Sequence, residues 1–75
     1  MLGAAYDDRI IDLLALSPLS TTRLAKELGV DDGALTLRLF NVLVAEGRIE
    51  ISGAAGSTPV WTLTASEREK RRARS

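Results

Sequence analysis

Residues 19–51 read LSTTRLAKELGVDDGALTLRLFNVLVAEGRIEI, and this stretch decides the fold. Its first part places apolar side chains at helical spacing between residues 24 and 28. The hydroxyl residues at 20–22 are suited to cap the start of such a helix, and Gly29 is typical of the position just after a helix end. The pattern therefore predicts a short amphipathic helix that is followed at once by a turn.

A longer helix is predicted from Gly33 to Glu46. Asp31 and Asp32 precede it as good N-cap residues, and Gly47 follows it. Its side chains most suited to face a core are Leu35 or Thr36, Leu39, Phe40 and Leu43.

After Gly47 the hydrophobic period changes from helical to alternating. Residues 48–52 and 60–64 each alternate between apolar and polar side chains, which is typical of strands. The segment between them, GAAGSTP, is small and contains glycine, so it predicts a hairpin with a longer loop. Pro59 fits the opening of the second strand because proline cannot donate a hydrogen bond inside a sheet.

On the other side of the deciding stretch, residues 6–16 read YDDRIIDLLAL. Apolar residues at positions 6, 10, 13 and 14 predict a helix with one apolar face. Ser17-Pro18 ends it, because the residue before a proline disfavours the helical conformation. The predicted order is thus helix, helix, tight turn, helix and hairpin, an α+β arrangement.

The chain of 75 residues is long enough for one small domain. It contains no cysteine and no histidine, which excludes a zinc finger, an iron–sulfur site and a histidine-based catalytic site. No carboxylates occur in a recognisable catalytic spacing, and no phosphate-binding loop is present. We therefore expect no enzyme activity, no cofactor and no metal. No apolar run is long enough to span a membrane, and a cytoplasmic protein is expected.

The formal net charge of zero hides an asymmetry along the chain. Residues 1–65 carry five basic and eight acidic side chains, whereas residues 66–75 carry five basic and two acidic ones. We expect the first range to form the folded domain. The second is expected to be a basic tail, either a frayed helix or disordered.

The order of elements and the residues of the deciding stretch resemble the winged helix-turn-helix superfamily, especially regulators of the MarR type. Arg38, Leu43 and Gly47 match positions at which that family tends to have Arg, Leu and Gly before the wing. The resemblance covers roughly residues 6–64 and implies a three-helix winged helix-turn-helix with a C-terminal β-hairpin wing. It also implies a small DNA-binding protein, a transcriptional or phage-type regulator that acts as a dimer on double-stranded DNA.

In that family the third helix enters the major groove. The resemblance then implies that Arg38 and Asn41 read bases, with Leu37 also facing the groove. Phosphate contacts would come from Arg23, Lys26 and Arg48, with help from the basic tail.

Other features of the sequence favour an interaction module of another kind. Residues 49–64, the predicted wing, contain no Lys or Arg to contact a phosphate. Asp31 and Asp32 place negative charge at the start of the third helix, where a phosphate would otherwise dock. Leu37 and Val44 would then form the centre of a contact with a protein partner or a second copy of the chain. Alternatively, this helix is apolar because it is the central, buried helix of a small domain.

Trp61 has two interpretations. The segment Gly56-Ser57-Thr58-Pro59-Val60-Trp61 is similar to the wing of Z-DNA-binding winged helices, in which a Pro and a Trp contact the duplex. Those domains also use an Asn and a Tyr on the third helix, at positions that are Leu37 and Asn41 here. A lone Trp in so short a chain is more useful as core volume, and this interpretation is favoured.

Overall fold

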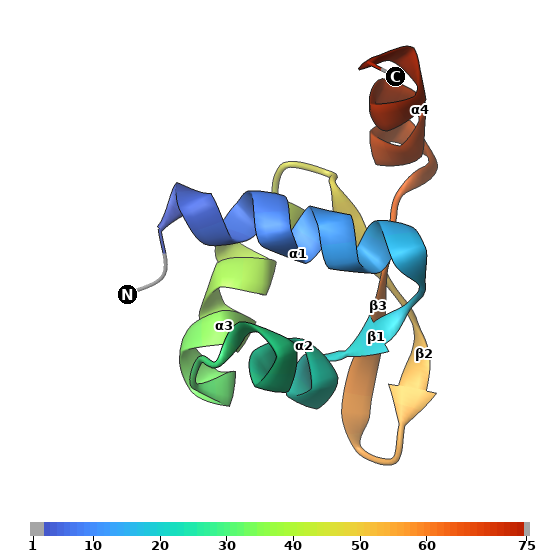
Figure 1. The fold of residues 1–75 in the computed structure, drawn as a ribbon. Coiled ribbons are helices and arrows are strands. Elements are labelled where there is room, and N and C mark those ends of the chain that lie inside the picture. Colours follow the sequence, from blue (N-terminus) through green and yellow to red (C-terminus); the bar gives the residue numbers. More distant parts are fainter. Residues whose placement is uncertain (1–2, 75) are drawn as a thin grey trace.

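The computed structural model describes residues 3–74, and for Arg74 the backbone alone. Met1, Leu2 and Ser75, which the predicted ranges include, lie outside the described residues. The α+β class predicted from the sequence is confirmed: helices pack on one three-stranded antiparallel sheet (Figure 1). Among the described residues, no helix is long and apolar enough to cross a membrane.

Helix α1 (Ala4–Leu16) starts the chain and ends at Ser17, as the following proline predicts. Its buried residues are Asp7, Ile10, Ile11 and Leu14. The buried face is therefore turned slightly from the one predicted, and Tyr6 and Leu13 lie half-buried at its edge. An aspartate on the buried face requires a partner inside the protein.

Helix α2 (Thr21–Leu28) has the ends that the sequence predicts. The hydroxyl oxygen of Ser20 accepts a hydrogen bond of 3.1 Å from the backbone N–H of Arg23. Gly29 ends the helix with a φ of 69°, in the left-handed region that favours glycine. The Val30 N–H then donates to the Ala25 carbonyl at 3.0 Å, which closes the turn before the next helix.

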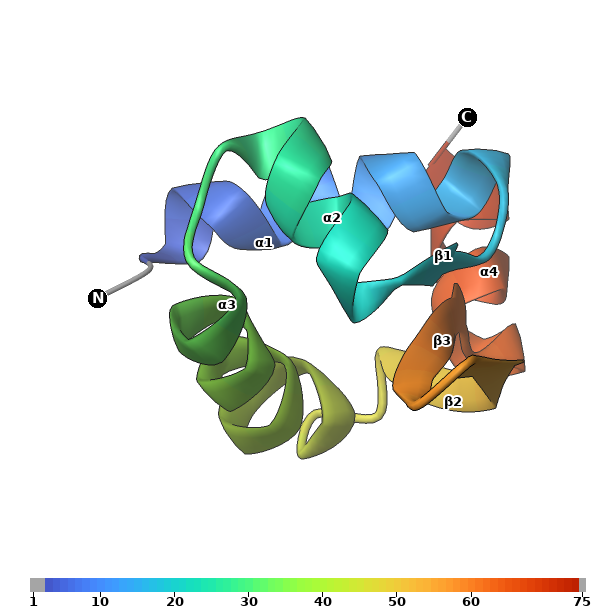
Figure 2. The ribbon, with the colours of Figure 1, turned by 90° about the horizontal axis from the view of Figure 1, so that it is seen from below.

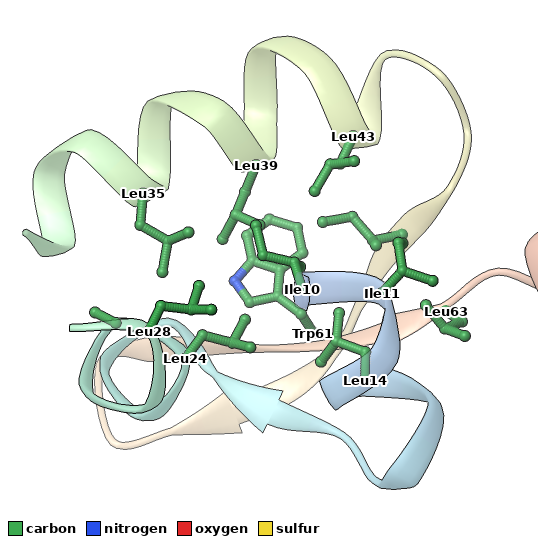
Figure 3. Close-up of a cluster of buried hydrophobic side chains, with 12 residues drawn as sticks. Ile10, Ile11, Leu14, Leu24, Leu28, Leu35, Leu39, Leu43, Trp61 and Leu63 are labelled. Carbon is green, nitrogen blue, oxygen red and sulfur yellow. The ribbon is translucent and has the colours of Figure 1, made fainter. Parts of the chain in front are cut away.

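The third helix has two parts: α3 (Asp32–Arg38) and a π-helical segment, η1 (Leu39–Val44). Asp31 caps it by accepting a hydrogen bond of 3.0 Å from the Ala34 N–H. Leu35, Leu39 and Leu43 are fully buried and point from this helix into the core (Figure 3), as predicted. Phe40 was also predicted to face the core. That prediction was wrong, because 45% of Phe40 is exposed.

The hairpin has longer strands and a tighter turn than predicted. Strands β2 (Ile49–Ala55) and β3 (Thr58–Leu63) pair antiparallel across a turn at Gly56 and Ser57, and Gly56 has a φ of 65°. The predicted loop GAAGSTP is thus mostly strand. A register shift between Ile51 and Gly53 accommodates an extra residue.

A two-residue strand, β1 (Leu19–Ser20), completes the sheet in the order β1-β3-β2. Leu19 pairs with Trp61 and Ser20 with Val60, so the start of α2 is fixed to the centre of the hairpin. The Trp61 side chain is fully buried among residues of α1, α2 and the third helix (Figure 3). Its Nε1–H donates a hydrogen bond of 2.7 Å to the Thr21 hydroxyl oxygen. The core interpretation of Trp61 is confirmed.

Helix α4 (Ala65–Arg74) forms the C-terminal segment, so a helix is the form that the basic tail takes. Thr64 caps it, because the Thr64 hydroxyl oxygen accepts a hydrogen bond of 3.2 Å from the Glu67 N–H. The same hydroxyl donates to the Gly47 carbonyl at 2.7 Å. Figures 1 and 2 place α4 on the opposite side of the molecule from α3.

Candidate interaction surface

The guanidinium group of Arg38 is held by Asp7 of α1. Its Nε and Nη2 donate hydrogen bonds of 2.8 and 2.6 Å to the two carboxylate oxygens. The Asp7 side chain is 9% exposed and that of Arg38 22%. This two-pronged geometry is the strongest that an Arg–carboxylate pair can adopt. The pair uses two of the five N–H donors of Arg38 and holds its guanidinium toward α1.

Arg48, at the start of the hairpin, is held in the same manner by Glu67 of α4. Its Nε and Nη2 lie 3.1 and 3.4 Å from the two carboxylate oxygens, and the Glu67 side chain is 6% exposed. The pair joins the C-terminal helix to the first strand of the hairpin. As placed here, Arg48 neutralises a buried acid and does not face outward as a phosphate contact.

The two pairs keep both arginines charged. The hydrogen bond with Asp7 raises the pKa of Arg38, against the effect of desolvation, and the hydrogen bond with Glu67 does the same for the pKa of Arg48. A pKa raised on folding means that the charged arginine stabilises the folded state at every pH below its ordinary value. This contribution of the two arginines is lost as the pH rises into the strongly alkaline range.

The other predicted contact residues are exposed. Arg23 and Lys26 lie on the outer side of α2, where Arg23 makes a 3.2 Å ion pair with Glu27. Asn41 is exposed on η1. Leu37 of α3 is 64% exposed, so it is not buried in the core.

The exposed side of the third helix is apolar. Leu37, Phe40 and Val44 are 64%, 45% and 37% exposed and follow one another at helical spacing. The ring of Phe40 packs edge-on against Trp61, with the centroids 5.1 Å apart. Ile51 is paired with Trp61 across the sheet and is 52% exposed. Directly opposed residues share a face of the sheet, so Ile51 extends the apolar surface onto the hairpin.

We call Leu37, Phe40, Val44 and Ile51 the apolar face. It contains no charged side chain, and the third helix and the hairpin that carry it lie on one side of the molecule (Figure 2). Scattered exposed apolar residues need no explanation, but four large ones do when two of them, Phe40 and Ile51, adjoin Trp61.

Sequence reasoning missed Asp7, Phe40, Ile51 and Glu67. A signal existed for Asp7, which stands three, four and seven residues before buried positions of α1. No local signal identifies Glu67, because its partner lies 19 residues away on another element. Phe40 and Ile51 have the periodicity of core residues, and only the packing shows that they are partly exposed.

Within residues 3–74 no group of three or more metal-ligating side chains is close enough together to hold an ion. A comparison of the chain with family models, curated proteins and solved structures found no match. The function therefore has to be argued from the surface itself.

Proposed function

We propose that the chain is a winged-helix interaction module that binds a second copy of itself through the apolar face. The observation that carries the proposal is the exposure of Leu37, Phe40 and Val44 on a helix whose one arginine is occupied by Asp7. The order of helices, the short strand β1 and the hairpin support the winged-helix assignment. A cytoplasmic location, expected from the sequence, belongs to the same proposal.

A second copy suits this face because the face is complementary to itself. Its four side chains carry no charge, so they bring no like charges together in a two-fold contact. Asn41 is exposed one residue after Phe40, and an amide group both donates and accepts hydrogen bonds. Two such amides are able to pair across a two-fold axis and set the register of the helices, as a single asparagine does in coiled coils.

The size of the molecule is also compatible with a dimer. A stable interface covers about 800 Å² on each partner. The described chain has an accessible surface of 4574 Å². An interface of that size would take up roughly one sixth of it. A domain of fewer than about 80 residues has a thin core, so apolar surface buried between two copies adds materially to its stability.

The test is sedimentation velocity over a range of protein concentrations. We expect a monomer–dimer equilibrium that changes little between low and high salt, because burial of apolar surface is not screened. A chain that stays monomeric at millimolar concentration would contradict the proposal.

Leu37→Glu is expected to weaken self-association by at least about tenfold while the monomer stays folded, because it places a charge in the contact. Leu16→Glu is the matched control. Leu16 is 84% exposed at the end of α1, outside the apolar face, and the same change there should leave the dimer unaffected. Circular dichroism of both variants checks the fold. Equal dimerisation of the two variants would exclude the apolar face as the interface.

DNA binding is the second candidate function. It is favoured by the exposure of Asn41, Arg23 and Lys26, three of the residues that the winged-helix resemblance assigns to DNA contacts. Lys26 and Arg23 would contact phosphates and Asn41 an adenine edge. DNA and a second copy would compete for the third helix. The two functions are distinguished by their dependence on salt.

Fluorescence anisotropy of a labelled duplex separates them. DNA binding through several phosphates should weaken steeply with salt, and Lys26→Gln should reduce affinity and flatten the salt dependence. If no duplex binding is found at low salt, the DNA candidate is excluded and self-association stands alone.

A further inference from the structure

Helix α4 docks on the domain without burying an apolar side chain of its own. Of the side chains that the structure describes in α4, Glu67 is buried, Arg71 is half-buried and the others are exposed, the two alanines included. Figure 1 shows the helix at the edge of the molecule, beyond the end of β3. An isolated helix of ten residues is marginal in water, and most helices in proteins are stabilised by packing an apolar face. The helix α4 therefore depends on its polar contacts.

The best covered of these contacts is the pair of Glu67 with Arg48. The Arg48 Nε and Nη2 donate to the two carboxylate oxygens at 3.1 and 3.4 Å, and the two side chains are 6% and 22% exposed. A covered pair is costly to break, because separation leaves a charge without its partner.

The other contacts of α4 with the domain are exposed. The Arg71 Nη1 lies 3.0 Å from the carboxylate of Asp12, whose side chain is 68% exposed. The Nη2 of Arg68, on the surface, donates to the Thr62 hydroxyl oxygen at 2.8 Å. Exposed polar contacts contribute little in water. The docking of α4 therefore rests mainly on Glu67 and Arg48.

The residue before α4 is fixed to the domain by other bonds. The Thr64 hydroxyl donates to the Gly47 carbonyl at 2.7 Å, and the Thr64 N–H donates to the Arg48 carbonyl at 3.1 Å. Both bonds end on the backbone at the start of the hairpin and involve no atom of α4. The chain can thus open after Thr64 without disturbing the sheet.

We propose that α4 is a latch: it opens as a unit after Thr64 while residues 3–64 stay folded, and the Glu67–Arg48 pair holds it closed. In the closed state the Arg48 guanidinium is neutralised and mostly covered. In the open state α4 loses the contacts that support its helix, and Arg48 is presented to solvent without an acid. The two states differ in the charge exposed at the start of the hairpin. The latch does not depend on the apolar face.

Native-state hydrogen exchange of the full ¹⁵N-labelled chain measures the opening. We expect the amides of residues 68–73 to be protected, but to exchange at least about tenfold faster than those of Leu14 and Leu39 in the core. Their exchange should depend little on denaturant, because opening of one helix exposes little surface. Exchange of α4 and the core at one rate with one denaturant dependence would overturn the proposal. So would α4 amides with no protection at all, because the closed state would then be absent.

Two variants test the pair itself. Glu67→Gln and Arg48→Gln should each accelerate exchange in α4 by about tenfold, the equivalent of one charge-assisted hydrogen bond, and change the core amides much less. Arg48 lies outside α4, so its effect on α4 cannot come from helix propensity. Glu69→Gln is the matched control. It removes the same charge from the same helix, but Glu69 is 73% exposed, and its effect should stay below about twofold.

The double variant of Glu67→Gln and Arg48→Gln completes the test. Its α4 amides should exchange little faster than those of either single variant, because each single change already breaks the pair. Multiplied accelerations would show that the two side chains stabilise α4 separately and would exclude the pair as the latch. Equal accelerations in Glu67→Gln and Glu69→Gln, or unchanged α4 exchange in Arg48→Gln, would exclude it as well.

Discussion

Trp61→Ala is expected to remove a large part of the free energy of unfolding. The indole is fully buried at the point where both helices of the deciding stretch, α1 and the sheet meet. Removing a buried tryptophan costs about 3–5 kcal/mol. A domain of this length has a free energy of unfolding of about 4–11 kcal/mol, so the loss amounts to between about a quarter and all of it. Chemical denaturation followed by circular dichroism measures the change.

Trp61→Phe is the informative companion variant. It keeps an aromatic ring for the edge contact with Phe40 but removes the N–H that donates to the buried Thr21 hydroxyl. We expect a smaller loss, about 1–3 kcal/mol for the unsatisfied hydroxyl in addition to the lost volume. If Trp61→Ala unfolded at the same denaturant concentration as the original chain, Trp61 would not be the centre of the core.

Asp7→Ala is expected to produce the second large effect. The change leaves the Arg38 guanidinium, itself mostly covered, without the carboxylate that accepts both of its hydrogen bonds. Removing one partner of a covered pair destabilises a protein more than the pair itself stabilises it. The loss in free energy of unfolding should clearly exceed that of Glu27→Ala, which breaks the exposed ion pair with Arg23.

A double-mutant cycle with Arg38→Gln tests the assignment. Because the two side chains act on one another, Asp7→Ala and Arg38→Gln should be far from additive, and the double variant should be little worse than either single one. Additive losses would show that the pair is not a unit. The cycle also bears on function: if Arg38 reads DNA, Asp7→Ala should release it and increase affinity for duplex DNA, provided that the variant remains folded.

Local sequence signals predicted the helices well because their ends depend on neighbours. Ser20 and Asp31 cap α2 and the third helix as expected, and Gly29 takes the left-handed conformation after α2. The alternation around Trp61 correctly predicted a hairpin. Strand β1 was not predicted, since two residues have no period and Leu19 is a strand only because Trp61 lies beside it.

The candidate site was predicted less well, because exposure and charge pairing depend on residues distant in the chain. Leu37 and Val44 were named as a possible partner surface, and both are exposed. Arg38 and Arg48 were named as DNA contacts from the resemblance alone. The acids that hold them, Asp7 and Glu67, lie 31 and 19 residues away.

The sequence by itself determined the α+β class, the caps and turns, and the row of leucines that fills the core, because these follow from local conformation and hydrophobic period. Only the tertiary structure decided which charges and apolar groups face outward. It pairs Asp7 with Arg38 and Glu67 with Arg48, and it packs the partly exposed ring of Phe40 edge-on against Trp61. The physical reason is that a carboxylate cancels a distant charge, and a neighbouring ring covers an apolar surface, only when folding brings them into contact.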